Sequence, residues 1–114
     1  MWKLTIEDDQ GQRTTVSLEA DLYTVGRADD NVVRLAERNV SRHHARVERK
    51  LDTWELTDLA SDNGCYVNGV PVVESRVLQH SDVITIGDFQ LHLLDESQLT
   101  QSDLKATVPA GNRL

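Results

Sequence analysis

The sequence predicts an all-β protein, a two-sheet antiparallel β-sandwich of about ten or eleven short strands. In most of the chain, apolar and polar residues alternate with a period of two, which is the pattern of a strand with one buried face. Turn-forming residues separate the alternating segments, and apolar residues show almost no helical spacing. Many short strands separated by turns are typical of sandwiches and barrels, and a sandwich buries one face of each strand.

Three alternating segments come first along the chain, and they predict strands within 2–6, 15–18 and 23–25. The run Asp-Asp-Gln-Gly at 8–11 supplies turn chemistry between the first two strands, and Asp-Asp-Asn at 29–31 supplies it after the third.

The later alternation predicts strands at 44–48, 54–57, 84–86 and 89–93. Two dipeptides, Asn68-Gly69 and Gly87-Asp88, have the chemistry of two-residue hairpin turns, because positive φ angles favour Gly and Asn.

The strand pattern stops near Leu94, which predicts one domain over residues 1–95. Residues 96–114 are polar and weakly patterned, so we expect a flexible tail or the start of a linker there. A short helix within 97–104 is compatible with the pattern.

Charge is unevenly spread along the chain. The formal net charge is −7, which argues against a general nucleic-acid-binding protein. Residues 26–50 nevertheless carry seven Lys and Arg residues against four acids. This basic segment has two interpretations: a local anion-binding site, or arginines that only solvate strands and loops.

Composition points to a cytoplasmic protein without a bound cofactor. No apolar run approaches the ~18 residues needed to cross a bilayer, and the N-terminus lacks the apolar region of a secretory signal. Cys65 is the single cysteine, so no internal disulfide can form. The four histidines and Cys65 lack the spacing of a zinc site, and no metal is expected.

Three short motifs fall between predicted strands, at 23–27 (Tyr-Thr-Val-Gly-Arg), 40–45 (Val-Ser-Arg-His-His-Ala) and 58–69 (Asp-Leu-Ala-Ser-Asp-Asn-Gly-Cys-Tyr-Val-Asn-Gly). Their order resembles the forkhead-associated (FHA) domain family, which shows Gly-Arg, then Ser-x-x-His, then two Asn-Gly pairs. The resemblance covers roughly residues 2–94. It implies an FHA/SMAD-like sandwich that acts as a phosphothreonine-dependent protein-binding module in signalling, and not as an enzyme.

Arg27, Ser41 and Arg42 have the chemistry that such a site needs. A phosphothreonine carries a charge of about −1.5 to −2 and three acceptor oxygens, so it requires a guanidinium and hydroxyl or N–H donors on a stiff scaffold. The resemblance implies that Arg27 contacts the phosphate or the ligand backbone beside it. It also implies that Ser41 donates its hydroxyl to a phosphate oxygen, with Arg42 offering its side chain or backbone N–H.

Asn63 and Asp62 complete the predicted phosphopeptide-binding set. The resemblance implies that the Asn63 carboxamide holds the backbone of the bound peptide. Asp62 departs from the family, in which many members have Thr or Ser just before this asparagine. Two alternatives stay open: Asp62 points outward and selects a basic residue on the ligand, or it weakens phosphate binding.

Five further residues match family positions that support the site. His44 is expected to hold the Ser41 segment through hydrogen bonds across loops. The other four are expected to shape turns and close approaches of the backbone; they are Gly26, Gly64, Asn68 and Gly69.

The expected partner is a phosphothreonine-containing protein, such as a Ser/Thr kinase or its substrate, with neither nucleic acid nor membrane involved. Attachment to further domains in a longer chain is also expected. Within the tail, Thr100-Gln101-Ser102-Asp103 resembles a ligand type that some FHA domains prefer, so Thr100 is a candidate for phosphorylation and docking, with a chance threonine as the alternative.

Two rival functions are compatible with the residues. The first is an FHA-fold scaffold that binds proteins without phosphate, for which Asp62 is the best support. The second is a hydrolase, because Ser41, His44 and Asp58 are the residue types of a catalytic triad.

Overall fold

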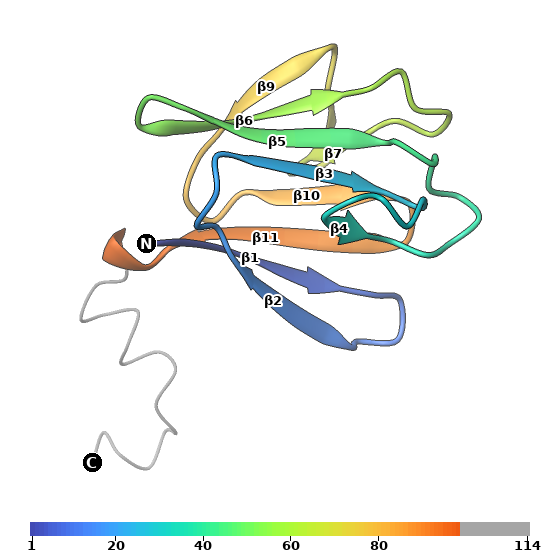
Figure 1. Cartoon of the computed structure of the whole chain (residues 1–114), viewed down its shortest axis with the longest axis horizontal. Helices are drawn as coiled ribbons and strands as arrows, with labels where there is room; N and C mark the ends of the chain where they lie inside the picture. Colours follow the sequence, from blue (N-terminus) through green and yellow to red (C-terminus); the bar gives the residue numbers. More distant parts are fainter. Residues whose placement is uncertain (99–114) are drawn as a thin grey trace.

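The computed structural model describes residues 1–98 as eleven strands in two sheets (Figure 1). In spatial order, the first sheet consists of β2 (Arg13–Ser17), β1 (Trp2–Glu7), β11 (Phe89–Asp95), β10 (Val83–Ile86), β7 (Tyr66–Val67) and β8 (Val70–Pro71). The second sheet consists of β4 (Val33–Arg34), β3 (Leu22–Gly26), β5 (Ala45–Lys50), β6 (Thr53–Asp58) and β9 (Ser75–Leu78). The predicted two-sheet sandwich is confirmed.

Strand pairing is antiparallel except between β3 and β4, where Val25 lies opposite Val33 in a parallel pair. The register puts apolar residues opposite one another on the inner face of each sheet. In the first sheet, Leu4 of β1 faces Leu93 of β11 on one side and Val16 of β2 on the other. Directly opposed side chains share a face, so this register joins the alternation of separate strands into one apolar layer.

The core between the sheets is built from the alternating residues of both. Trp54 is its largest fully buried side chain, and its ring lies 6.1 Å from that of Tyr23. The Tyr23 hydroxyl forms two hydrogen bonds: it accepts one from the Ala20 N–H at 2.8 Å and donates one to the Ser17 carbonyl at 3.3 Å. Because the Tyr23 hydroxyl is satisfied, its burial costs little, and the close-packed core gives the connecting loops a stiff base.

The Asn68-Gly69 turn joins β7 to β8 with φ angles of 51° and 83°, as a hairpin with two positive φ angles requires. The Asn68 side chain does more than form the turn. Its Nδ2 donates to Asp82 at 2.9 Å, and its Oδ1 accepts the Val83 N–H at 3.0 Å. This residue therefore ties the short β7–β8 hairpin to the start of β10.

The loops most relevant to binding leave the sandwich at one end, on the right of Figure 1. They are the connection from β3 through β4 to β5 and the connection from β6 to β7. The N-terminus and a 3₁₀ turn over Glu96–Gln98 lie at the opposite end. Within residues 1–98, no helix is long and apolar enough to cross a bilayer. Most of the helix expected within 97–104, and Thr100, lie outside the described residues.

Candidate functional site

Gly26 ends β3 at a point where two segments of backbone come very close together. A Cβ atom at residue 26 would collide with the carbonyl oxygen of Arg42 and would lie 2.9 Å from Nδ2 of Asn31. Only glycine fits this approach without displacing the loop. Gly26 thus lets the 40–42 segment lie directly against the end of β3.

Arg27 is the next residue in the chain, and it forms two hydrogen bonds with the 40–42 segment. Its backbone N–H donates to the Ser41 carbonyl at 2.9 Å, and its side-chain Nε donates to the Val40 carbonyl at 3.0 Å. The Nε bond fixes the guanidinium beside residues 40–41. Within residues 1–98, no hydrogen bond or ion pair occupies its two terminal nitrogens, so these donors are available to a ligand.

Ser41 is half-buried between the loops that hold Arg27 and Asp62. Its backbone N–H donates to Nδ1 of His44 at 3.0 Å, and its Oγ accepts the N–H of Asp62 at 3.0 Å. Because Oγ accepts in this bond, the hydroxyl hydrogen stays available for donation. The serine is therefore held in place by a bond that leaves its donor unused.

His44 is fully buried, with 0% of its surface exposed. Nδ1 accepts from Ser41, so the ring proton sits on Nε2, which donates to the Gly64 carbonyl at 2.8 Å. Gly64 has a φ of 78°, a left-handed conformation that residues with a Cβ adopt at a cost. The imidazole thus bridges the Ser41 loop and the β6–β7 loop.

Asn63 makes a second bridge between these two loops, because its Nδ2 donates to the carbonyl of Asn39 at 2.9 Å. The bridge uses one of the two amide hydrogens and leaves the side-chain oxygen free. Asp62 and the side chain of Arg42 are exposed beside it. Arg27, Ser41, Asp62 and Asn63 therefore lie on three segments that hydrogen bonds join at one surface.

Asn31 is a structural residue of this site that the sequence did not reveal. It is 8% exposed, and its Nδ2 donates to the carbonyls of Ala28 and Arg42, both at 2.8 Å. Asn31 therefore links the 28–31 turn to the Arg42 segment through its side chain. The run Asp29-Asp30-Asn31 signals a turn, but nothing in that signal tells which of the three side chains points inward.

The exposed side chains of His43 and Asp30 are hydrogen-bonded close to Asn31, with 3.0 Å between Nε2 and a carboxylate oxygen. The hydrogen bond from the His43 imidazole holds the pKa of Asp30 below its ordinary value. The pair links the 29–31 turn to the loop that carries Ser41.

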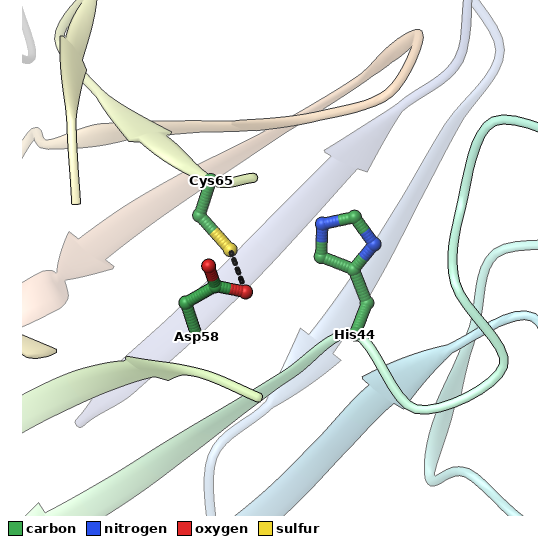
Figure 2. Close-up of side chains that lie close together, drawn as sticks. All are labelled: His44, Asp58 and Cys65. Atoms are coloured by element: carbon green, nitrogen blue, oxygen red, sulfur yellow. Dashed lines mark hydrogen bonds between the residues drawn. The ribbon is translucent and has the colours of Figure 1, made fainter. Parts of the chain in front are cut away.

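A group of possible metal ligands lies beneath the loops, where His44, Asp58 and Cys65 point toward one another within 4.8 Å (Figure 2). Burial, together with the nearby Asp58 charge, raises the pKa of the Cys65 thiol to about 12, so the thiol stays protonated at neutral pH. A cysteine binds zinc as the thiolate, and a histidine binds it through a free imidazole nitrogen. Both His44 nitrogens are already used by backbone groups, so this cluster is suited to packing and not to holding a metal.

The triad geometry expected of the hydrolase alternative is also missing from the described residues. The Ser41 hydroxyl bonds the Asp62 N–H, whereas the His44 ring bonds the backbone of Ser41 and Gly64. A nucleophile needs its base within hydrogen-bond reach. The hollows found elsewhere on the molecule, about 240 and 430 Å³ in volume, are lined by none of the predicted site residues.

The FHA domain family model matches residues 23–87, a range that contains all three segments of this surface. Among curated proteins, the oxoglutarate dehydrogenase inhibitor of Corynebacterium jeikeium is 40% identical over 81 residues, which is 71% of this chain and 56% of that protein. Across the first relatives matched, the chain spans between 10% and 56% of their length.

Solved structures show the same fold. One comes from a structural and functional analysis of phosphothreonine-dependent FHA domain interactions; it is 29% identical, with a TM-score of 0.70 over 82% of this chain and 95% of that one. Another is the FhaA FHA domain complexed with the intracellular domain of Rv3910, which is 31% identical, with a TM-score of 0.72 over 82% of this chain and 99% of that one.

Proposed function

The chain belongs to the FHA domain family, and from that premise we propose that it binds phosphothreonine-containing segments of partner proteins through the loops at one end of the sandwich. One observation carries the proposal. The Ser41 hydroxyl is held by the Asp62 N–H so that its own hydrogen is free, and it lies on the segment that anchors the Arg27 guanidinium. A hydroxyl donor and a guanidinium fork at one surface suit a phosphate dianion.

Arg27, Ser41 and Arg42 would bind the phosphate. Arg27 would direct its free terminal nitrogens at the phosphate oxygens, since its Nε is already bonded to Val40. Ser41 would donate its hydroxyl, and the exposed Arg42 would add a second guanidinium. Charge-assisted bonds of this kind contribute about 1.5–3 kcal/mol each.

Asn63 would hold the peptide backbone beside the phosphothreonine. The hydrogen bond to Asn39 uses one amide hydrogen of Asn63. The side-chain oxygen stays available as an acceptor, and the second amide hydrogen stays available as a donor. An extended peptide offers complementary groups along its backbone. His44 would act indirectly, by fixing the loops that carry Ser41 and Asn63.

Preference for threonine over serine would come from a contact with the threonine methyl group. One buried methyl is worth roughly 0.8 kcal/mol, and the stiff rotamer of a β-branched residue adds to the preference.

The protein would act as a binding module, without catalysing a reaction, in a pathway that depends on a Ser/Thr kinase. FHA domains are binding modules, and the FhaA domain forms a complex with the intracellular domain of Rv3910. We place this chain in the cytoplasm on the same reasoning, with the buried free thiol of Cys65 in accord.

Docking without phosphate is the second candidate, and Asp62 favours it. An exposed carboxylate on the residue that bonds Ser41 opposes the approach of a dianion. In that case the loops would serve as a neutral docking surface.

Binding to a degenerate phosphothreonine peptide library decides between the two candidates, with unphosphorylated and phosphoserine versions run in parallel. The proposal expects binding confined to the phosphothreonine library. Equal binding of the unphosphorylated library would contradict it and favour phosphate-independent docking.

A further inference from the structure

Asp62 is an exposed acid at the centre of the candidate site. Its backbone N–H donates to Oγ of Ser41 at 3.0 Å, so the residue sits directly beside the proposed phosphate-binding hydroxyl. Its carboxylate forms no hydrogen bond or ion pair with any other residue in the part of the chain described, 1–98. By contrast, the Asp58 carboxylate accepts the Ser61 N–H, and that of Asp30 pairs with His43.

The two loops that meet at Ser41 carry opposite charge. The connection from β3 to β5 has a formal charge of +1, from four arginines and three acids, namely Arg27, Arg34, Arg38, Arg42, Asp29, Asp30 and Glu37. The connection from β6 to β7 contributes Asp62 as its one charged residue. Ser41 lies between them, bonded to Arg27 through its carbonyl and to Asp62 through its hydroxyl. The serine therefore lies between a connection of formal charge +1, which carries Arg27 and Arg42, and a connection of formal charge −1.

A phosphate placed at Ser41 would pair with the guanidinium groups of Arg27 and Arg42 and would leave the Asp62 charge uncompensated. The negative charges of the phosphate and of the Asp62 carboxylate would repel each other, even at an exposed surface. A cation supplied by the ligand, lying against Asp62, converts that repulsion into an attraction.

We propose that Asp62 is a specificity-determining residue that selects phosphothreonine segments carrying Lys or Arg close to the phosphothreonine. The inference rests on the proposed function and names the ligand class within it. The distance over which the Asp62 charge acts limits how far along the peptide the cation can lie from the phosphothreonine. Screening limits it to about 8 Å at physiological salt, and an extended chain advances about 3.3 Å per residue, so the cation falls within about two residues of the phosphothreonine.

The test uses a phosphothreonine peptide flanked by alanines and a set in which a single lysine replaces one alanine at each position from two before to two after the phosphothreonine. Affinities are measured for the parent chain, for Asp62→Asn and for Asp29→Asn. Asp29 is the matched control, because it is exposed in the β3–β5 connection and its replacement changes the net charge by the same amount. Asp62→Asn keeps the backbone N–H that bonds Ser41.

The parent chain should bind the best lysine peptide about two- to fivefold more tightly than the alanine peptide, which is the range of an exposed ion pair. Asp62→Asn should lose this preference and bind the alanine peptide more tightly than the parent does. Asp29→Asn should keep the preference. A charge-reversed variant, Asp62→Lys, should favour glutamate in place of lysine at the same position.

Phosphate-dependent binding with no lysine preference in the parent chain overturns the inference and leaves the proposed function standing. A preference that persists in Asp62→Asn, or that Asp29→Asn loses equally, also overturns it, because the effect then belongs to another residue or to net charge. Failure of every phosphothreonine peptide to bind overturns the proposed function itself.

Discussion

Ser41 and Arg27 are the residues whose side chains the proposed phosphate contact uses most directly. Replacing either with alanine should weaken phosphopeptide binding by more than about 1.5 kcal/mol, or at least tenfold, the low end for a charge-assisted hydrogen bond. Titration calorimetry with one phosphothreonine peptide measures this loss. Ser75→Ala and Arg13→Ala are the matched controls, since both residues are exposed on strands β9 and β2. Parent-like affinity in Arg27→Ala would mean that the phosphate site lies elsewhere.

His44 should matter for folding more than for chemistry. Replacing it with alanine leaves the Ser41 N–H and the Gly64 carbonyl without partners and opens a cavity under the loops. The free energy of unfolding should fall by about 3 kcal/mol, the combined size of a lost buried hydrogen bond and a cavity. Urea denaturation tests this, with the exposed neighbour His43→Ala as control, expected within about 0.5 kcal/mol of the parent. An equally small effect at His44 would show that the bridge is dispensable.

Cys65 should be unreactive in the folded protein and should make stability fall at high pH. The folded-state pKa of about 12 exceeds the ordinary value of 9.0, so the folded protein retains a proton that the unfolded chain releases. Stability is therefore complete below pH 9 and declines as the pH rises from 9 toward 12. Denaturation at a series of pH values should show a shallower decline in Cys65→Ser, which has no thiol to titrate. At pH 8, iodoacetamide should label the parent chain only after denaturant is added.

At the scale of elements, the junction of β3, β4 and β5 depends on Gly26. Gly26→Ala would drive a methyl group into the Arg42 carbonyl and toward the Asn31 amide. Overpacking of this kind costs roughly 1–3 kcal/mol, which corresponds to a fall of at least about 4 °C in the melting temperature of a domain this size. Thermal denaturation measures the fall, and amide NMR shifts should change most at Arg27, Asn31 and Arg42. An unchanged melting temperature would show that the loop adapts freely.

The sequence predicts the long strands well because each has enough residues to show the period of two. Strands such as β5 and β6 bury every second residue over their first four positions, as their alternation indicates. The strands β4, β7 and β8 have two residues each, too few for a periodic signal. The parallel pairing of β3 with β4 depends on how the chain returns across the sheet end, which alternation alone does not encode.

In the candidate site too, the sequence predicts some features and not others. The types and order of Arg27, Ser41 and Asn63 are legible as motifs, so the sequence indicates the chemistry. The bond from Asp62 to the Ser41 hydroxyl and the inward turn of Asn31 arise from tertiary contacts between segments 11 to 21 residues apart. Local propensity contains no information about such contacts.

At the scale of the whole molecule, the sandwich separates the binding loops from the N-terminus and from Gln98, the last residue that the structure describes. The candidate site lies at one end of both sheets, and Met1 and the 3₁₀ turn lie at the other (Figure 1). The relatives matched are longer than the stretch that this chain covers.

The predicted domain boundary at residue 95 gives a test at this scale. The first sheet closes with β11, where Leu93 is fully buried and Asp95 is held by the Ser97 N–H and hydroxyl and by the N-terminal amine. A chain ending at Gln98 retains all of these contacts. It should keep the melting temperature within about 2 °C, the size of a shift expected when no named contact is lost, and it should keep the phosphopeptide affinity. Calorimetry on both chains measures the two quantities. A lower melting temperature would mean that residues 99–114 contribute to the fold, and a higher affinity would mean that they compete with the peptide for the loops.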